Sequence, residues 1–317
     1  MLMWHVGIDI GGGGGRLRAL SPETVIDLDI GLPLQVGPSG SNVVEVTAAA
    51  ARALENIQPG LEIDAVALGA SGVMSLVPHR DVLHQTLADG FLCKRTAVAS
   101  DALTAHLGAL GGEPGAIVVV GTGLIALGTD FQDVWRRIDG WGHLLGDNGS
   151  GAWIGLRGLR AGLAALDGRP HASPHLLELV AADLGAPTRW PALFQTSPDR
   201  AHRLASIAPV VAQAAREGDT EARRILTKAA RHIADALAAA ASGGVPPVAA
   251  VTGGVMNTDP PLMPMIAERL ATRRPDVVLR SPVGTPLDGA VELAARLADG
   301  CWRRSVEPLV TIKEVMQ

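Results

Sequence analysis

Residues 4–20 read WHVGIDIGGGGGRLRAL, a β-type run that ends in five consecutive glycines and continues into a second β-type run. The pattern predicts strands near Trp4–Ile10 and Arg16–Leu20, joined by a glycine turn. Without Cβ atoms, several backbone N–H groups in such a turn can converge on phosphate oxygens, while a strand-end carboxylate, here Asp9, can hold a magnesium ion or its waters. A ligand-free hairpin turn is the alternative.

Two further glycine turns follow predicted strands. Gly121-Thr122-Gly123 comes after a β-type run at residues 117–120, and Gly253-Gly254 comes after another at residues 247–252. Each turn alone is weak evidence, because glycine is common in turns of every kind. Phosphate binding is one reason for three such turns in a single chain.

Short β-type runs and Ala-rich helical stretches alternate along the chain, which favours an α/β fold with buried sheets. In the first part, the pattern predicts further strands at residues 24–30, 65–69 and 95–99, and helices at residues 43–57 and 101–110. The turn cluster Gly111–Gly115 separates the two parts of the chain. We therefore expect a first domain over residues 1–112.

The second part opens as the first does, with short strands at residues 117–120, 124–128 and 134–138, which suggests an internal duplication. Residues 171–242 have apolar positions at helical spacing and are expected to be an α-helical insertion. A strand near residues 277–279 and a helix that opens at Pro286 complete a second domain over residues 113–302. Residues 303–317 are expected to be a C-terminal tail.

Composition excludes several classes of protein. The 317 residues are 3% aromatic, with no Tyr, and carry 27 basic against 32 acidic side chains, which argues against a nucleic-acid partner. The apolar run at residues 116–129 is shorter than the roughly 20 residues that span a bilayer, so no membrane span is expected. Residues 1–10 lack a secretory pattern, so we expect a cytoplasmic protein. Cys93 and Cys301 are expected to be reduced packing residues.

The commonest nucleotide-binding motifs do not fit. A Walker loop requires a lysine after its glycines, and none of Lys94, Lys228 and Lys313 follows a glycine. A dinucleotide-binding loop requires a third glycine where Arg16 stands.

The glycine turns occur together with Ser100-Asp101 and the segment Gly140–Gly155, which reads GWGHLLGDNGSGAWIG. In this order the motifs resemble the N-acetylglucosamine kinases grouped with the BadF/BadG/BcrA/BcrD ATPases, within the actin-like, hexokinase-like and Hsp70-like superfamily. The resemblance covers about residues 4 to 298. The segment Gly140–Gly155 is its most specific part, because Trp, His, Asp and glycines at these spacings rarely coincide by chance.

The resemblance implies an α/β fold of two ribonuclease-H-like (actin-like ATPase) domains with a central cleft that closes on MgATP and a sugar. It further implies an ATP-dependent kinase that transfers the γ-phosphoryl group to the 6-hydroxyl of N-acetylglucosamine or glucosamine. ATP and Mg²⁺ are the implied cofactors. Relatives are commonly dimers, so a homodimer is expected.

By the same resemblance, Asp101 is the general base for the sugar hydroxyl, although its position also suits a helix N-cap. Asp9 would hold Mg²⁺ through water. The implied nucleotide-binding residues are Asp9, Gly11, Gly12, Gly13, Gly14, Gly15, Arg16, Gly121, Thr122, Gly123, Gly253 and Gly254. The implied sugar-binding residues are Asn42, Ser71, Gly72, Asp101, Thr122, Trp141, Gly142 and Asp147. The alternative interpretation of Asn42 is a turn residue that binds no sugar. Trp153 and His143 are expected to be packing residues.

The chain departs from the family pattern at four positions. Gly13 and Gly15 stand where relatives usually carry hydroxyl side chains, Leu124 replaces Ser, and Asn148 replaces Glu. The first three changes remove side-chain donors to phosphate and keep open an alternative, a sugar-sensing protein with little or no catalysis. A second alternative, an ATPase that drives an acyl-CoA reductase or dehydratase, requires cluster-binding cysteines, and neither cysteine lies in a matching motif.

Overall fold

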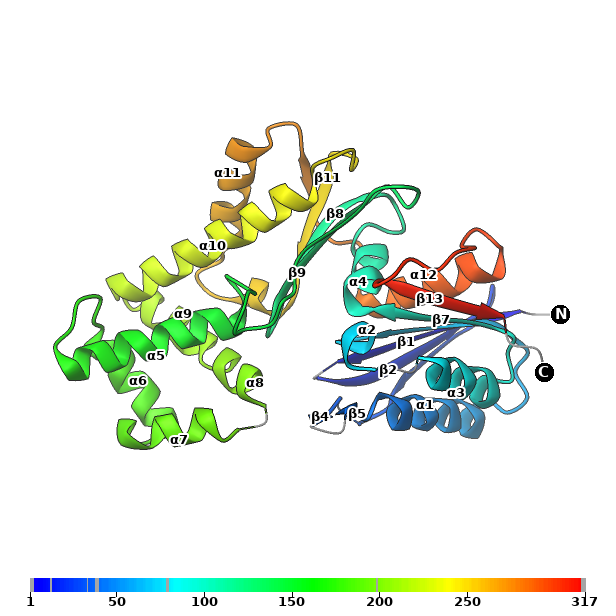
Figure 1. Cartoon of the computed structure of the whole chain (residues 1–317), viewed down its shortest axis with the longest axis horizontal. Helices are drawn as coiled ribbons and strands as arrows, with labels where there is room; N and C mark the ends of the chain where they lie inside the picture. The colour runs from blue at the N-terminus through cyan, green and yellow to red at the C-terminus, as the bar shows by residue number, and fades with distance from the viewer. Residues whose placement is uncertain are drawn as a thin grey trace. The chain divides into compact units, whose positions relative to one another are not determined.

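The protein is described by a computed structural model that covers residues 3–11, 13–32, 34–37, 40–77, 80–197 and 199–314. Gly12 therefore lies outside the described residues, as do Pro38 and Ser39. The chain forms two compact units. Unit 1 comprises Met1–Glu113 and Pro282–Gln317, and unit 2 comprises Pro114–Ser281. Each unit has its own sheet covered by helices (Figure 1), which confirms the expected α/β class.

The sheet of unit 1 has six strands in the order β13-β7-β6-β1-β2-β3. Their bounds are β1 (Trp4–Gly11), β2 (Gly14–Leu20), β3 (Val25–Asp29), β6 (Ile63–Ala70), β7 (Arg95–Ser100) and β13 (Val310–Glu314). The three central strands β1, β6 and β7 run parallel, whereas β2, β3 and β13 are antiparallel to their neighbours. The carboxyl ends of β1, β6 and β7 therefore meet at one edge of the sheet.

Helices cover both faces of this sheet (Figure 1). The helices α1 (Val43–Ile57) and α3 (Asp81–Phe91) lie on one face, and α4 (Asp101–Ala109) and α12 (Pro286–Ala298) lie on the other. Helix α1 forms where expected because its buried side chains repeat every three to four residues, at Val43, Val46, Ala50 and Leu54. The short helix α2 (Val73–Leu76) and the strand pair β4 (Val36–Gly37) and β5 (Gly40–Ser41) complete the unit.

Helices α4 and α12 approach each other backbone to backbone. A Cβ atom at Gly289 would lie 1.8 Å from the carbonyl oxygen of Thr104, and one at Gly108 would lie 1.9 Å from that of Thr285. Only glycine fits at these two contacts. This packing, and the pairing of β13 with β7, place residues 282–317 in unit 1. The units thus differ from the expected division, in which residues 113–302 formed the second domain and residues 303–317 a tail.

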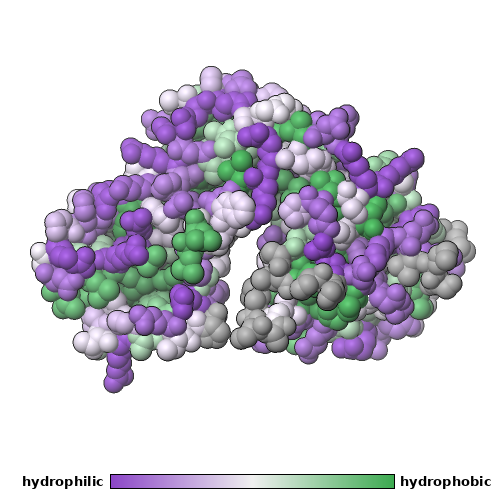
Figure 2. All heavy atoms as spheres, in the orientation of Figure 1, coloured by the Kyte–Doolittle hydropathy of each residue, from purple (hydrophilic) through white to green (hydrophobic). Residues whose placement is uncertain are grey.

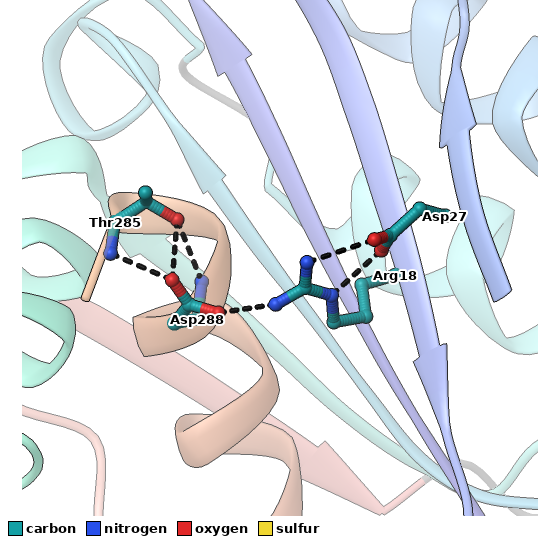
Figure 3. A network of polar contacts seen from close by, with 4 residues as sticks. All are labelled: Arg18, Asp27, Thr285 and Asp288. Carbon is teal, nitrogen blue, oxygen red and sulfur yellow. Dashed lines mark hydrogen bonds and ion pairs between the residues drawn. The ribbon is translucent and has the colours of Figure 1, made fainter. Parts of the chain in front are cut away.

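A polar network also attaches α12 to the sheet (Figure 3). The Arg18 guanidinium on β2 donates two hydrogen bonds, of 2.6 and 2.8 Å, to the Asp27 carboxylate on β3 and pairs with Asp288 on α12. Asp288 in turn accepts the Thr285 backbone N–H at 2.7 Å, while the Thr285 hydroxyl accepts the Asp288 N–H at 3.3 Å. This capping box begins α12 next to Pro286, as the sequence predicts.

Unit 2 repeats the strand order of unit 1. Its sheet runs β10-β9-β8-β11-β12, with β8 (Gly115–Val120), β9 (Leu124–Thr129), β10 (Trp135–Asp139), β11 (Val248–Thr252) and β12 (Val278–Arg280). Three consecutive strands form an antiparallel meander, and β11 adds parallel to β8 and β12 parallel to β11. The order β3-β2-β1-β6-β7 in unit 1 has the same directions. The two sheets therefore share one topology, in agreement with the duplication suggested by the sequence.

Most helices of unit 2 pack against one of two long helices, α5 (Gly151–Asp167) and α10 (Thr220–Ala240) (Figure 1). The other helices are α6 (Pro174–Leu184), α7 (Trp190–Gln195), α8 (Arg200–Ala205), α9 (Ala208–Arg216) and α11 (Met263–Arg273), with 3₁₀ turns η1 (Pro187–Arg189) and η2 (Gly254–Asn257). Residues 171–242 are mostly helical, as predicted. Asp219 caps α10 by accepting the Ala222 N–H at 2.7 Å.

The surface and the cysteines complete the description. Figure 2 shows hydrophilic side chains over much of the visible face, with smaller groups of hydrophobic ones between them. No helix in the described part of the chain is both long and apolar enough to cross a bilayer. Cys93 is buried, and its burial raises the pKa of its thiol to about 12, so it is a packing residue as expected. Cys301 is exposed, so the packing interpretation does not hold for it.

Candidate functional site

Three predicted site residues lie at the same edge of the unit 1 sheet. Asp9 is near the carboxyl end of β1, Ser71 directly follows β6, and Asp101 directly follows β7. The strands are in register at this edge, because Ala70 pairs with Ile10 on one side and with Ser100 on the other. Parallel strands bring such residues together however far apart they are in the sequence, and ligands commonly bind at this edge of α/β sheets.

The Asp101 carboxylate is held by two donors. The Ser71 hydroxyl donates to its Oδ2 at 2.7 Å, and the Ala102 backbone N–H donates to its Oδ1 at 2.9 Å. The N-cap of α4 is Ser100, whose hydroxyl accepts the Leu103 N–H at 3.3 Å. Asp101 is therefore the first residue of the helix rather than its cap, and its carboxylate is half-buried at the positive end of the helix dipole.

Asp9 is a half-buried carboxyl group beside a second one. Burial and, to a lesser extent, the charge of Asp101 raise the pKa of Asp9, the charge of Arg16 opposes them, and the net result is a pKa of about 6. Two neighbouring carboxylates repel each other, so a cation bound here would favour the ionised form of Asp9.

The structure distinguishes the glycines of the first turn. Gly11 pairs with Gly14 where β1 and β2 meet. Gly13 is exposed, and a Cβ atom there would meet no atom within 4 Å. Gly15 is buried, and a Cβ atom there would lie 3.0 Å from Cγ1 of Val46 on α1. A hydroxyl side chain thus fits at position 13 but would point into the core at position 15.

The predicted sugar ligand Asn42 supports its own loop. Its Oδ1 accepts the backbone N–H of Gln35 at 2.7 Å, and its backbone N–H donates to the Gln35 carbonyl at 3.1 Å. The residue precedes α1 but makes no side-chain cap. Gly72 adopts a φ of +68° at the start of α2, a conformation that glycine accommodates without strain.

In unit 2, two predicted glycine turns lie at one edge of the sheet. The turn Gly121–Gly123 joins β8 to β9, and its carbonyls at Gly121 and Thr122 accept the first N–H groups of α5 at 2.9 and 3.1 Å. The Gly253 backbone passes so close to this turn that a Cβ atom would lie 2.3 Å from the Val120 carbonyl oxygen. Thr122 and Gly254 are exposed beside these contacts.

In the loop after β10, the side chains of Trp141 and Asp147 lie in different environments, one exposed and the other buried. Asp147 is only 6% exposed, and its Oδ1 accepts the Gly142 N–H at 3.1 Å. Burial raises the pKa of Asp147. Its backbone N–H donates at 2.7 Å to Asp139, a residue that no sequence motif marks. In this structure the Asp147 carboxylate is occupied within unit 2, where it stabilises its own loop.

Trp141, by contrast, is 65% exposed, and its ring lies 4.7 Å from the guanidinium carbon of Arg137. His143 and Trp153 are half-buried. Trp153 packs edge-on against His232, in line with the packing role expected for it.

A protein-family model and a characterised relative are both similar to most of this chain. The family model described as BadF/BadG/BcrA/BcrD ATPase family matches residues 6–294. An N-acetylmuramic acid/N-acetylglucosamine kinase of Clostridium acetobutylicum is 28% identical over 243 residues, which are 73% of this chain and 77% of the relative.

Solved structures of other proteins are similar to this chain as well. A protein of Chromobacterium violaceum, provisionally named an N-acetylglucosamine kinase, is 28% identical, with a TM-score of 0.66 over 92% of this chain and 98% of its own. A ROK hexokinase of Thermus thermophilus shares the fold at 19% identity, with a TM-score of 0.57 over 95% of this chain and 100% of its own.

Proposed function

Because the chain belongs to the BadF/BadG/BcrA/BcrD ATPase family, we propose that it is an ATP-dependent amino-sugar kinase. It transfers the γ-phosphoryl group of ATP to the 6-hydroxyl of N-acetylglucosamine or glucosamine. The names of the relatives support a sugar acceptor. The observation that carries the proposal is the placement of Asp9, Ser71 and Asp101 at one edge of the unit 1 sheet.

Asp101 is the proposed general base. Phosphoryl transfer requires a positioned acceptor hydroxyl and a carboxylate that takes its proton. The Ser71 hydroxyl and the Ala102 N–H both donate hydrogen bonds to the Asp101 carboxylate, one to each oxygen, and so fix its orientation. The carboxylate is therefore oriented before substrate binds and can accept a proton at an Oδ atom.

Magnesium fits the residues that are present. Within the described ranges no three His, Cys, Asp or Glu side chains gather into a metal site. Mg²⁺ in kinases is typically held by one or two carboxylates, waters and the nucleotide phosphates. Asp9 supplies such a carboxylate, directly or through water. When bound, the ion neutralises charge on the phosphate oxygens.

The glycine turns are the proposed phosphate and nucleotide contacts. Gly11, Gly13 and Gly14 in unit 1, and the turns at Gly121–Gly123 and Gly253–Gly254 in unit 2, are exposed or half-buried and carry no side chain except at Thr122, whereas Gly15 belongs to the same turn but is buried. Backbone N–H groups in such turns bind phosphate oxygens without any side-chain donor. Gly12 belongs to the same proposal but lies outside the described residues.

One observation favours a second candidate, a sugar sensor. The first turn has Gly13 at its open tip, where a hydroxyl would fit but none is present. A protein that binds the sugar without efficient phosphate handling would tolerate this loss. A sensor has no use for a general base, however, so the fixed carboxylate of Asp101 favours the kinase.

A turnover assay distinguishes the two. Purified protein with MgATP is given N-acetylglucosamine, glucosamine, N-acetylmuramic acid, glucose and N-acetylmannosamine in turn, and ADP release is followed. The kinase proposal expects sugar-dependent ADP release, with the phosphate located on the product by NMR. Asp101→Asn, purified in parallel, controls for contaminating kinases. Sugar binding by calorimetry with no turnover for any sugar would support the sensor and refute the kinase.

A further inference from the structure

A pocket lies among the helices of unit 2, and none of its lining residues is among the predicted nucleotide-binding or sugar-binding residues. It has a volume of about 380 Å³ and is bounded by side chains of α5, α10 and α11. Of its nine lining residues, five are Arg or Lys and only Asp235 is acidic. This composition contrasts with the whole chain, whose net charge is −5. The pocket is therefore rich in cationic side chains although the chain as a whole has a negative net charge.

The helical repeat produces this concentration. Arg224, Lys228, Arg231, His232 and Asp235 follow one another at spacings of three, four or one residue, so they share one face of α10. Arg157 extends toward the pocket from α5 and Arg269 from α11. The opposite face of α10 is apolar and packs into the core of unit 2. Burial of that face fixes the direction in which the cations point.

Neighbouring carboxylates neutralise two of the five cations. Arg224 pairs with Glu221 one turn earlier on α10, and Arg269 makes two hydrogen bonds to Asp235, at 3.0 and 3.2 Å.

The other three, Arg157, Lys228 and Arg231, have no ion pair with any residue in the described part of the chain. All three are exposed, so a ligand can reach them. Three cations without counter-charges at one pocket match an anion with more than one negative charge.

The remaining walls are Trp153, Ile225 and His232. Arg157 lies 5.1 Å from the Trp153 ring centre, which orients its guanidinium. Burial lowers the pKa of the His232 imidazole; of the nearby charges, Asp235 and Asp139 raise it, whereas Arg157 and Lys228 lower it. The imidazole therefore responds to the charges around the pocket and to an anion bound there. The apolar wall and the volume suit an organic molecule better than a bare inorganic ion.

We propose that this pocket binds the phosphate monoester of a small metabolite, with Arg157, Lys228 and Arg231 around the phosphate and Trp153 and Ile225 beside the organic part. A sugar phosphate and a nucleoside monophosphate share this chemistry. The proposal is independent of the kinase assignment, because it uses none of the residues on which that assignment rests.

Calorimetry and NMR of the full chain test the proposal. The probes are N-acetylglucosamine 6-phosphate, AMP, inorganic phosphate and unphosphorylated N-acetylglucosamine. The His232 imidazole signal, assigned with His232→Gln, localises binding to this pocket even if a probe also binds at the glycine turns. We expect at least one ester to bind saturably, to raise the pKa of His232 and to bind more weakly as salt increases. The ester that binds more tightly shows whether the pocket prefers a sugar phosphate or a nucleoside monophosphate.

Matched variants make the test specific. Lys228→Gln and Arg231→Gln should each weaken ester binding by about tenfold or more. Arg160→Gln changes an exposed arginine of α5 outside the pocket and should leave binding within about twofold of the parent. No shift of His232 with either ester would overturn the proposal, as would equal binding by the Lys228→Gln and Arg160→Gln variants. Inorganic phosphate binding as tightly as both esters would overturn the assignment of an ester.

Discussion

The Ser71 hydroxyl donates a hydrogen bond of 2.7 Å to the Asp101 carboxylate, although 30 residues separate the two in the chain. The two residues follow neighbouring parallel strands, so the sheet register sets their distance. A hydrogen bond from a neutral donor orients a carboxylate without neutralising it. The pair therefore resembles a base and its positioning residue, and both roles can be tested.

Asp101→Asn should reduce kcat for the amino sugar by about 10²–10⁴, because an amide cannot take the proton of the acceptor hydroxyl. Sugar affinity, measured by calorimetry, should stay within about threefold of the parent, because the amide keeps the size and one acceptor oxygen of the carboxylate. Ser71→Ala should reduce kcat by about 3–30-fold, since it removes the orienting bond and leaves the base. Turnover of Asp101→Asn close to that of the parent would remove Asp101 from the role.

Asp9→Asn should separate stability from activity. Burial and Asp101 raise the pKa of the folded-state Asp9 from 3.8 to about 6. The ionised carboxylate therefore costs stability, and this cost develops as the pH rises from about 4 to about 6. In magnesium-free buffer near pH 8, the asparagine variant should gain up to about 2–3 kcal/mol in unfolding free energy, with little gain near pH 4.

Kinase activity of Asp9→Asn should fall at every pH, since the carboxylate proposed to hold magnesium is lost. Denaturant unfolding at the two pH values measures the first effect, and ADP release measures the second. A variant less stable than the parent near pH 8 would contradict the assigned burial of Asp9.

Threonine at the two unusual glycines should have opposite consequences. Gly13→Thr places a hydroxyl at an open turn tip and should lower the KM for ATP by about 3–10-fold, through one added hydrogen bond to phosphate. Gly15→Thr would push against Val46 in the core and should lower stability by about 1–3 kcal/mol. Steady-state kinetics and thermal unfolding of both variants check the pair. An unchanged KM for Gly13→Thr would show that position 13 does not face phosphate.

Asp288→Ala should destabilise unit 1 by about 1–3 kcal/mol, because it removes the capping box of α12 and a partner of Arg18. Although burial acts to raise it, hydrogen bonds from Thr285 and the charge of Arg18 lower the pKa of Asp288. The difference in unfolding free energy between parent and variant should therefore be largest near neutral pH and should shrink as the pH falls below about 4.

Asp27→Ala is the matched control, because it removes the other, more exposed partner of Arg18 but no cap, and it should cost about 0–1 kcal/mol. Thermal unfolding near pH 7 and near pH 3 measures both variants. Equal losses for Asp27→Ala and Asp288→Ala would show that the cap contributes nothing.

Gly123→Ala should be destabilising because the added methyl group would lie 2.4 Å from Oδ2 of Asp147. Asp147→Ala should also be destabilising, since the Gly142 N–H loses its acceptor. The double variant should be less destabilised than the sum of the two, by about 1 kcal/mol or more, because the clash disappears with the carboxylate. Additive losses would show that the two side chains do not meet.

Much of the fold could be predicted from local pattern. The periodic burial of α1, the glycine turn after β1 and the proline at the start of α12 each depend on neighbouring residues in the chain. Helix α3 and strand β13 could not be predicted in this way. Residues 310–314 form a strand because they pair with β7, more than 200 residues earlier in the chain. The local sequence pattern does not indicate that pairing.

The sequence by itself determined the order of glycine turns, the carboxylates at strand ends and the family to which the chain belongs, because these depend on residue type and spacing. Tertiary structure alone decided which of two similar glycines faces solvent, which aspartate is enclosed by its own loop, and that α5, α10 and α11 gather cations at one pocket. The physical reason is that burial and electrostatic environment belong to contacts between distant segments. Those contacts exist only once the sheets and helices have packed.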